Sequence, residues 1–358
     1  AQLEQEALEL CRGKDAVLFF AGLRDTEEAE SYDRQHLELP AIQSALIERI
    51  ASENQNVVVV LHAGSPVRLP WLGKVKAVLL MGLGGQMVGA ATLDLLLGRA
   101  NPSGKLAETW PLALEDTPAY EEFGKRFNTQ YRESVFVGYR YYQSFAKPVC
   151  FPFGFGLSYT SFAIDNLQVS QTSLAPGETL EISVRVSNTG SRAGKEVLQL
   201  YVAPPDSALF RPQKELKAFA IVALEPGESR VVHFELQHSD FTYWNAANHS
   251  WHCGAGAYRL LLGTSAADTP LEAVVEVASD QPEVSVPDYT QSAPGYYAYG
   301  SGALKVSDAA FEAVYGRPLP VDPQGEPKPF DLNSTLWDAR KRLRGKLLAV
   351  ILKREGRK

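Results

Sequence analysis

The amino-acid sequence predicts a layered α/β domain with a largely parallel sheet, then an all-β sandwich of two sheets, and a C-terminal helical extension. Two observations predict this architecture. Up to about residue 110, short apolar segments alternate with segments of helical period, whereas from 167 to about 277 the hydrophobic period is two. We therefore expect one domain at 1–165 and another at 166–280, followed by a linker and a basic helix over 281–358.

Five consecutive segments predict the α/β domain. The run Val57–Ala63 is dominated by β-branched residues, which is typical of a strand covered on both faces. The order strand, helix, strand, strand, helix favours a largely parallel sheet. In chain order, the expected elements are a strand at Ala16–Leu23, a helix at Ala41–Asn54, strands at Val57–Ala63 and Ala77–Met81, and a helix at Gln86–Gly98.

A long aromatic segment, 111–165, separates this domain from the sandwich. A stretch of this length without a clear period is usually functional or forms an interface. We expect it to pack between the domains and to bury five aromatic side chains against the α/β domain. These are Phe151, Phe153, Phe155, Tyr159 and Phe162.

Alternating strands with turn residues between them predict the second domain. Strands are expected at Leu180–Val186, Val197–Val202 and Val231–Leu236. This spacing is typical of an immunoglobulin-like or fibronectin type III sandwich, although the Cys…Trp…Cys spacing of antibody domains is absent from the sequence. Further on, the basic segment Asn333–Lys358 is expected to form a helix packed on its own protein. Contact with a partner or an anionic surface, and a frayed tail, are the alternatives.

Composition argues against several classes of function. The formal net charge is −7 and the pI is near 5.5, which disfavours binding to nucleic acid or to an anionic membrane. The apolar runs are far shorter than the roughly 20 residues of a membrane span. Three cysteines without a CxxC pair and six histidines without an HExxH motif predict neither a disulfide framework nor a metal site. We expect no metal and no cofactor.

A glycine-rich loop, Gly82–Gly89, follows an expected strand and precedes an expected helix. It fits the dinucleotide pattern GxGxxG poorly, because Met87 stands at the third glycine position. We expect its glycines to serve a tight turn. A nucleotide-binding α/β protein remains a minor alternative.

An acidic loop follows the first expected strand and spans Asp25–Arg34. In α/β sheets, ligands bind outside the carboxyl ends of strands, which is where this loop lies. Crowded carboxylates raise one another's pKa, and a general acid near neutral pH needs a raised pKa. The alternative is a solvated cluster of charges without chemistry.

Several segments, taken together and in order, resemble glycoside hydrolase family 3, the family of β-glucosidases and related exo-acting enzymes. The resemblance covers roughly residues 8–280 and includes the acidic loop. The matching segments are Glu28–Pro40, Val57–Trp71, Gly98–Pro111, Tyr131–Tyr142, Phe151–Phe162, Gly194–Pro204 and Lys214–Phe219.

The resemblance implies a three-part enzyme with a (β/α)8 barrel, an α/β domain and a fibronectin type III-like domain. The family's acid/base glutamate lies in a loop written Glu-x-Glu-Gly-(Tyr/Phe)-Asp-Arg, which matches 28–34 here, with serine in place of glycine at position 31. The resemblance therefore implies Glu30 as the acid/base, with Glu28 and Glu27 as alternatives. It implies that Asp33 and Arg34 support the loop, and it gives Glu133 a weaker claim to a supporting or substrate-binding role.

No barrel sequence accompanies these segments, so we expect a C-terminal fragment or subunit of a retaining exo-acting β-glycosidase, inactive alone. A domain-inverted enzyme cut before its barrel is the alternative form. The expected partners are a β-linked oligosaccharide or aryl glycoside and the (β/α)8 barrel domain. A second copy of the chain, forming a homodimer, is a further option. Without a visible signal peptide we expect a cytoplasmic protein, with secretion left open. A non-catalytic carbohydrate-binding or interaction module is the competing function.

Overall fold

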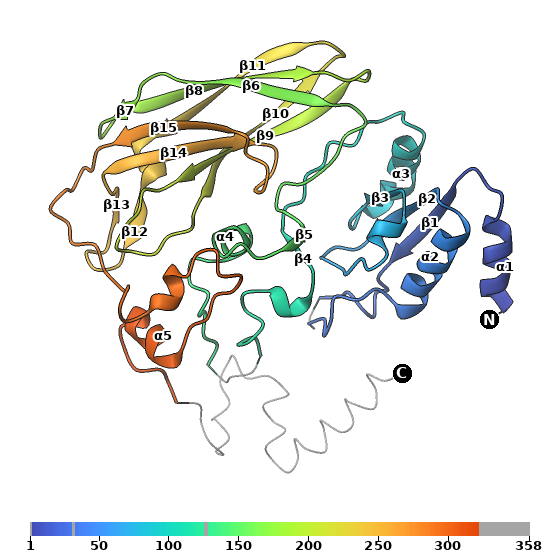
Figure 1. Ribbon diagram of the computed structural model, residues 1–358, viewed down its shortest axis with the longest axis horizontal. Helices are drawn as coiled ribbons and strands as arrows, with labels where there is room; N and C mark the ends of the chain where they lie inside the picture. The colour runs from blue at the N-terminus through green and yellow to red at the C-terminus, as the bar shows by residue number, and fades with distance from the viewer. Residues whose placement is uncertain (1, 31–32, 125–127, 322–358) are drawn as a thin grey trace.

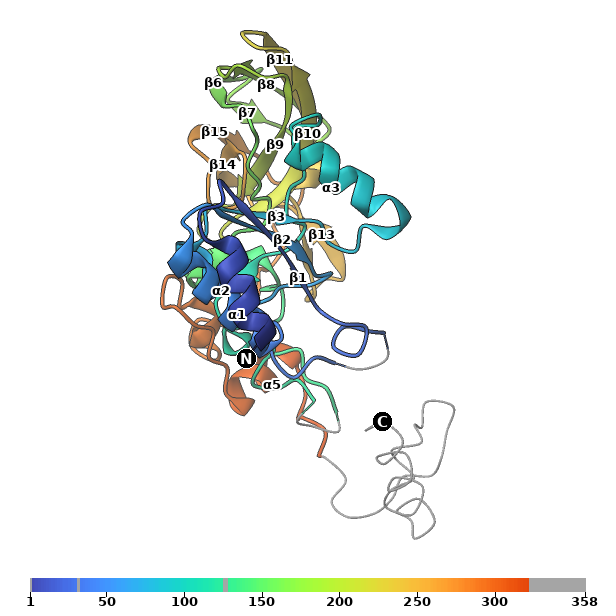
Figure 2. The same ribbon diagram turned by 90° about the vertical axis from the view of Figure 1, so that its right-hand side faces the viewer.

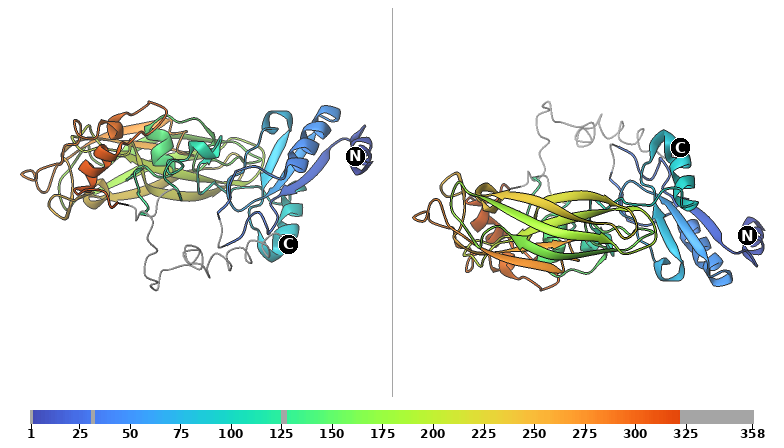
Figure 3. Two further views of the ribbon diagram at one scale, coloured as in Figure 1. Left: turned by 90° about the horizontal axis from the view of Figure 1, so that it is seen from below. Right: turned by 90° about the horizontal axis from the view of Figure 1, so that it is seen from above.

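The computed structural model describes residues 2–30, 33–124 and 128–321, and the helix expected at Asn333–Lys358 lies outside these residues. An α/β domain and a β-sandwich lie side by side, joined by an irregular aromatic segment (Figure 1). The segment that follows the sandwich lies at the opposite end of the molecule from the α/β domain (Figure 3). Among the described residues, no helix is both long and apolar enough to cross a bilayer. The predicted order of an α/β layer followed by an all-β sandwich is confirmed.

Three parallel strands form the sheet of the α/β domain, in the order β1-β2-β3. In register, Val17 pairs with Val57 and Val58 pairs with Ala77. The central strand β2 is the most buried, which explains why its sequence is an unbroken apolar run. The elements are β1 (Val17–Gly22), α2 (Ala41–Glu53), β2 (Val57–His62), η1 (Leu72–Lys74), β3 (Ala77–Leu80), η2 (Gly85–Met87) and α3 (Val88–Leu96).

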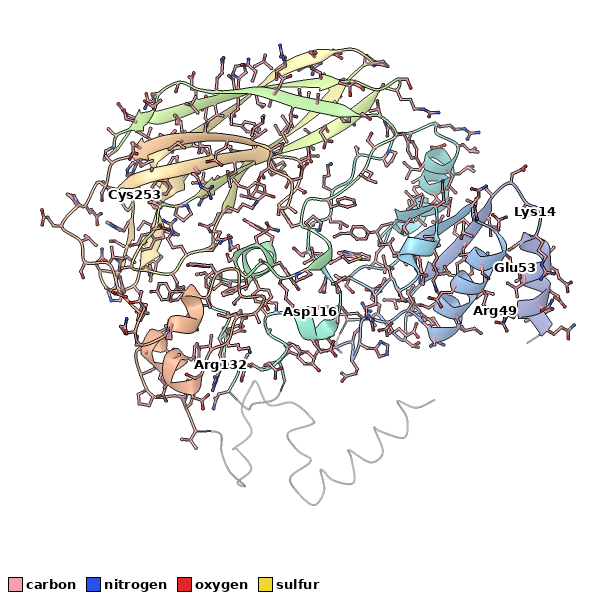
Figure 4. All side chains as sticks on the ribbon, in the orientation of Figure 1. Lys14, Arg49, Glu53, Asp116, Arg132 and Cys253 are labelled. Atoms are coloured by element: carbon pink, nitrogen blue, oxygen red, sulfur yellow. The ribbon has the colours of Figure 1, made fainter. Side chains whose placement is uncertain are left out.

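The helix α1 (Gln2–Cys11) precedes the sheet and was absent from the sequence-based prediction. It packs beside α2 (Figure 2). Its contact face is narrow, with only Leu8 and Cys11 buried, and half of its residues are Gln or Glu. Asn54 secures its end by donating from Nδ2 to the carbonyl oxygen of Cys11 at 3.0 Å. Figure 4 shows Arg49 and Glu53 of α2 on the side that faces α1.

The helix expected at Gln86–Gly98 divides into the short turn η2 and the helix α3. Gly85 adopts φ +62° at the start of that turn, which glycine tolerates better than other residues. Gly98 adopts φ +66° beyond the last turn of α3, as is common after helix ends. Gly85 therefore serves backbone geometry at this turn, which agrees with the expected tight turn.

The sandwich consists of a five-stranded sheet, β10-β9-β14-β15-β7, and a three-stranded sheet, β11-β8-β6. Alternate residues of β8, from Leu180 to Val186, point into the core between the two sheets, which is the period-two pattern of the sequence. The strands are β6 (Phe162–Val169), β7 (Ser173–Leu174), β8 (Thr179–Asn188), β9 (Gly194–Ala203), β10 (Glu215–Leu224), β11 (Ser229–Gln237), β14 (Gly256–Gly263) and β15 (Leu271–Val277).

The aromatic segment between the domains divides its rings between two cores. Phe151 stacks on Phe155 and packs against the α/β core. Phe153 instead stacks on Tyr139 beside the sandwich, and Phe162 packs against the sandwich core. The expectation that all five rings face the α/β domain is therefore too simple. The segment's elements are β4 (Trp110–Pro111), η3 (Leu114–Asp116), α4 (Tyr139–Ser144) and β5 (Val149–Phe151).

Polar contacts join the loop after α3 to the sandwich strand β9 and the turn before it. Lys105 Nζ lies 2.7 Å from Glu196 Oε1 and donates to the carbonyl oxygen of Gly156 at 2.8 Å. Asn101 Nδ2 donates to the carbonyl oxygen of Ala193 at 2.9 Å. Because these groups come from both domains, they fix how the α/β domain sits on the sandwich.

Lys214 lies partly buried just before β10, beside Tyr201 of β9. The Nζ atom of Lys214 lies 5.3 Å from the centre of the Tyr201 ring, a cation–π contact. Among the described residues it makes no ion pair with a carboxylate. Burial, with a smaller contribution from Arg259, lowers the pKa of Lys214 to about 8.

Replacing Lys214 with methionine is expected to stabilise the protein at pH 7, on the order of 1–2 kcal/mol after loss of the cation–π contact. The unfolded chain keeps this proton up to its ordinary pKa, whereas the folded chain gives it up near pH 8. Between these values the unfolded state binds more protons, so wild-type stability rises with pH. Urea unfolding should show that the difference in free energy of unfolding between Lys214→Met and the wild type is smaller at pH 9.5 than at pH 7. A constant difference would contradict the lowered pKa.

The chain after the sandwich packs back onto the aromatic segment. Tyr296 is fully buried and stacks on Phe210, with ring centres 4.4 Å apart. Its hydroxyl donates to the carbonyl oxygen of Arg132 at 2.8 Å, and Arg132 Nη1 donates to that of Val306 at 3.0 Å. Figure 4 shows Arg132 beside α5. The remaining elements are η4 (His238–Phe241), β12 (Tyr243–Asn245), β13 (Ser250–His252), η5 (Pro294–Tyr297) and α5 (Asp308–Tyr315).

Candidate active-site loop

The acidic loop leaves the sheet at the carboxyl end of β1, beside the chain that leaves β2. Gly22 and His62 are register partners at the ends of these parallel strands. A Cβ atom on Gly22 would lie 2.5 Å from the His62 carbonyl oxygen, so only glycine fits. The two loops therefore start close together at the edge where α/β sheets bind ligands.

Glu28 ties the acidic loop to the loop after β2. Its Oε2 accepts the backbone N–H of Gly64 at 2.8 Å, and its Oε1 accepts the hydroxyl of Ser65 at 2.7 Å. A Cβ on Gly64 would lie 2.7 Å from Leu83 Cδ1, so this position favours glycine. Glu28 is thus held by two neutral donors and acts as an anchor.

Arg34 extends this network from the other end of the loop. Its Nη1 donates to Ser65 Oγ at 2.8 Å and to the Pro66 carbonyl oxygen at 3.0 Å. Ser65 therefore accepts from Arg34 and donates to Glu28, which links both ends of the loop to one residue. Burial lowers the pKa of Arg34, and its Nη2 is buried without a hydrogen-bond partner among the described residues. Asp33 is exposed and contributes its backbone carbonyl, which accepts from Gln35.

The other two glutamates of the loop differ in their partners. Glu27 pairs with Arg24, with Nη2 and Oε1 2.6 Å apart, and this hydrogen bond lowers the pKa of Glu27. A carboxyl with a lowered pKa is a poor general acid. Glu30 is exposed and, within the described ranges, makes no hydrogen bond or ion pair.

Glu108 is a further carboxyl near this site, and no sequence motif singled it out. Partial burial raises its pKa, and the negative charge of Glu28 adds a smaller contribution. The only signal in the sequence was its place inside the segment Gly98–Pro111. Glu133 belongs to a different part of the molecule, next to Arg132 and buried near Tyr296. The described residues hold no cluster of three or more His, Cys, Asp or Glu side chains suited to a metal.

Replacing Glu28 with alanine is expected to loosen the acidic loop, because the Gly64 N–H and the Ser65 hydroxyl lose their acceptor. Limited proteolysis within 23–34 should become faster by about five- to tenfold, equivalent to about 1–1.5 kcal/mol of local stability. Glu38→Ala removes only an exposed ion pair with Arg68, outside this segment, and serves as the control. Equal cleavage of both variants would contradict the anchoring role of Glu28.

Comparisons with known proteins identify the family. Residues 1–159 match the family model of the glycosyl hydrolase family 3 C-terminal domain, and residues 196–266 match a fibronectin type III-like domain. Thermostable beta-glucosidase B of Acetivibrio thermocellus is 44% identical over 279 residues, 78% of this chain. The chain belongs to glycosyl hydrolase family 3. The resemblance stated from sequence motifs is thereby confirmed.

Other family 3 proteins match the same region. An exo-alpha-(1->6)-L-arabinopyranosidase of Bifidobacterium breve is 40% identical over 280 residues, 78% of this chain. The crystal structure of a Bifidobacterium adolescentis family 3 beta-glucosidase superposes with a TM-score of 0.75 at 36% identity, covering 97% of this chain and 45% of that one. The beta-glucosidase of Kluyveromyces marxianus in complex with glucose gives 0.73 at 38% identity, covering 77% and 33%. The chain spans 37% of the length of the Acetivibrio relative.

Proposed function

We propose that this chain supplies the general acid/base of a retaining exo-acting β-glycosidase, and that Glu30 is that residue. The observation that supports this choice is the division of roles in the acidic loop. Glu28 is held by Gly64 and Ser65, and Glu27 by Arg24. Glu30 alone among the three has a carboxyl that no described residue engages.

In the proposed reaction, a carboxylate on a barrel domain attacks the anomeric carbon while Glu30 protonates the glycosidic oxygen. The bond from the anomeric carbon to that oxygen breaks, and a glycosyl-enzyme forms. Water then attacks the same carbon, gives its proton to Glu30, and releases the sugar and the nucleophile. The two carboxyls must stand about 5–5.5 Å apart, so the loop has to be placed against the barrel.

The anchors of the loop suit this arrangement. Glu28 and Arg34 both form a hydrogen bond with Ser65 in the loop after β2, whereas Glu30, between them in the sequence, is exposed. A reactive group carried on a loop gains precision from such supporting hydrogen bonds. We infer that contact with the barrel completes the positioning of Glu30.

The names of the relatives suggest the substrate class. Several are beta-glucosidases, and two are exo-alpha-(1->6)-L-arabinopyranosidases. We propose terminal β-linked glucosides as the substrates. From the change in hydrophobic pattern along the sequence, we also propose domain bounds of 1–165 and 166–280.

Hydrolysis of 4-nitrophenyl β-glucoside tests the division between two domains. The chain alone is expected to show no turnover, and addition of a family 3 barrel domain should produce it. The contrary outcome is hydrolysis of glucosides by the chain alone, with hydrolysis of cellobiose lost in Glu30→Gln. That result would place the nucleophile within these residues and contradict its assignment to a separate barrel domain. Binding of glucosides without turnover in the presence of the barrel would favour a non-catalytic module.

A further inference from the structure

A short hairpin of the sandwich domain carries a pair of tryptophans that the proposed reaction does not use. Its strands β12 and β13 are antiparallel, and Trp244 lies directly across from Trp251. Their ring centres are 5.8 Å apart and the rings are inclined by 77°, an edge-to-face pair. Trp244 is 50% exposed and Trp251 is 61% exposed.

The other side of the hairpin anchors it to the protein. Tyr243 and His252 are cross-strand partners with perpendicular rings, and His252 is buried. The guanidinium of Arg211 lies over the Tyr243 ring at 5.0 Å. Asn245 is fully buried and donates from Nδ2 to the carbonyl oxygen of Ser285 at 3.0 Å. Because the inner residues are fixed, the backbone that carries the two indoles is in place before any ligand arrives.

The composition of the hairpin indicates the chemistry of its ligand. Residues 242–253 contain no Asp, Glu, Lys or Arg, so the hairpin itself offers no acidic, lysine or arginine side chain to an ionic partner. Polar groups that are neutral flank the rings, including Asn248, which donates from its side chain to Ser250 Oγ at 2.7 Å. Exposed aromatic faces beside neutral hydrogen-bonding groups suit a molecule with C–H faces and hydroxyl edges.

The size of the surface argues against a protein partner. A tryptophan buries at most about 250 Å² when covered, so two half-exposed rings offer roughly 250–300 Å². A stable protein interface needs about 800 Å² on each partner. The pair is therefore large enough for one or two sugar rings and too small for a second copy of the chain.

We propose that Trp244 and Trp251 form a binding site for neutral saccharides, in which the indoles contact the C–H faces of pyranose rings. The site goes beyond the proposed hydrolysis and does not depend on Glu30. It would hold a glycan on the sandwich domain through contacts that involve no bond cleavage.

Affinity electrophoresis in native gels containing hydroxyethylcellulose, barley β-glucan or laminarin tests the proposal with the chain as it is. At least one polymer should retard the wild-type chain. Trp244→Ala and Trp251→Ala should each weaken the apparent affinity by about three- to tenfold. Phe219→Ala removes an exposed aromatic side chain elsewhere on the sandwich and should leave retardation unchanged. Glu30→Gln should also leave it unchanged, which separates this site from the proposed catalytic one.

A conservative double variant tests whether an effect of the alanine variants comes from unfolding of the hairpin. Trp244→Tyr with Trp251→Tyr keeps two aromatic faces and should retain most of the retardation. Three results would overturn the proposal: no retardation of the wild-type chain by any of the polymers, equal retardation of both alanine variants and the wild type, or loss of retardation in the tyrosine variant with unchanged thermal stability. Concentration-dependent dimers that disappear in Trp251→Ala would assign the surface to a second copy of the chain and also overturn it.

Discussion

Replacing Glu30 with glutamine is expected to lower the hydrolysis of cellobiose by about 10²–10⁴-fold in a polypeptide that joins this chain to a family 3 barrel domain. The glucose leaving group of cellobiose is a poor one, so its oxygen must be protonated as the bond breaks. Glutamine has nearly the same size as glutamate but has no proton of suitable acidity to give. Initial rates at saturating cellobiose measure the effect on the step that needs the acid.

Aryl glucosides provide the internal comparison. The leaving group of 4-nitrophenyl β-glucoside needs little protonation, so formation of the glycosyl-enzyme should fall much less in Glu30→Gln than with cellobiose. Glu27→Gln is the matched control, because Glu27 is paired with Arg24 and should be nearly neutral in effect. An unchanged rate of cellobiose hydrolysis in Glu30→Gln would contradict the assignment of Glu30 as the acid/base. A large loss in Glu27→Gln instead would move the role to that residue.

Replacing Lys105 with methionine is expected to destabilise the chain by about 3–5 kcal/mol. Lys105 and Glu196 lie at the junction of the two domains, with side chains only 12% and 10% exposed. Removing the ammonium leaves the Glu196 carboxylate buried without its counter-charge, and the Gly156 carbonyl loses a donor. Urea unfolding followed by circular dichroism gives the change in the free energy of unfolding.

A double-mutant cycle separates the loss of the pair from the cost of an unpaired charge. The variant Lys105→Met with Glu196→Leu should recover much of the lost stability, because neither charge then remains buried. Arg185→Met breaks an exposed ion pair with Asp165 and should cost less than about 1 kcal/mol. A Lys105→Met effect as small as that of the control would mean that the junction is held by its apolar and backbone contacts.

Much of the fold could be predicted from the sequence because the relevant patterns are local. The strand expected at Ala16–Leu23 is β1 at Val17–Gly22, and the helix expected at Ala41–Asn54 is α2 at Ala41–Glu53. In each case a clear apolar period marks the element. The helix α1 was missed because half of its residues are Gln or Glu and only Leu8 and Cys11 are buried, so its apolar face is small.

The candidate site could be located from the sequence but not resolved into roles. The motif placed an acidic loop after a strand and offered Glu27, Glu28 and Glu30 as acids. Only the folded chain shows that Glu28 meets Gly64 and Ser65. The same holds for Glu108, whose pKa is raised mainly by its burial in the folded chain and to a smaller extent by the charge of Glu28.

The sequence by itself determined the class of each domain and the approximate bounds of the strands and helices that have a clear apolar pattern, because propensity and hydrophobic period are local. It also indicated the family, through a series of short motifs in order. The tertiary structure decided which carboxyls are anchored, which ion pair joins the domains, and which tryptophans remain exposed on an anchored hairpin. The partners of a polar side chain come from distant segments, such as Lys105 and Glu196, and no local pattern encodes that choice.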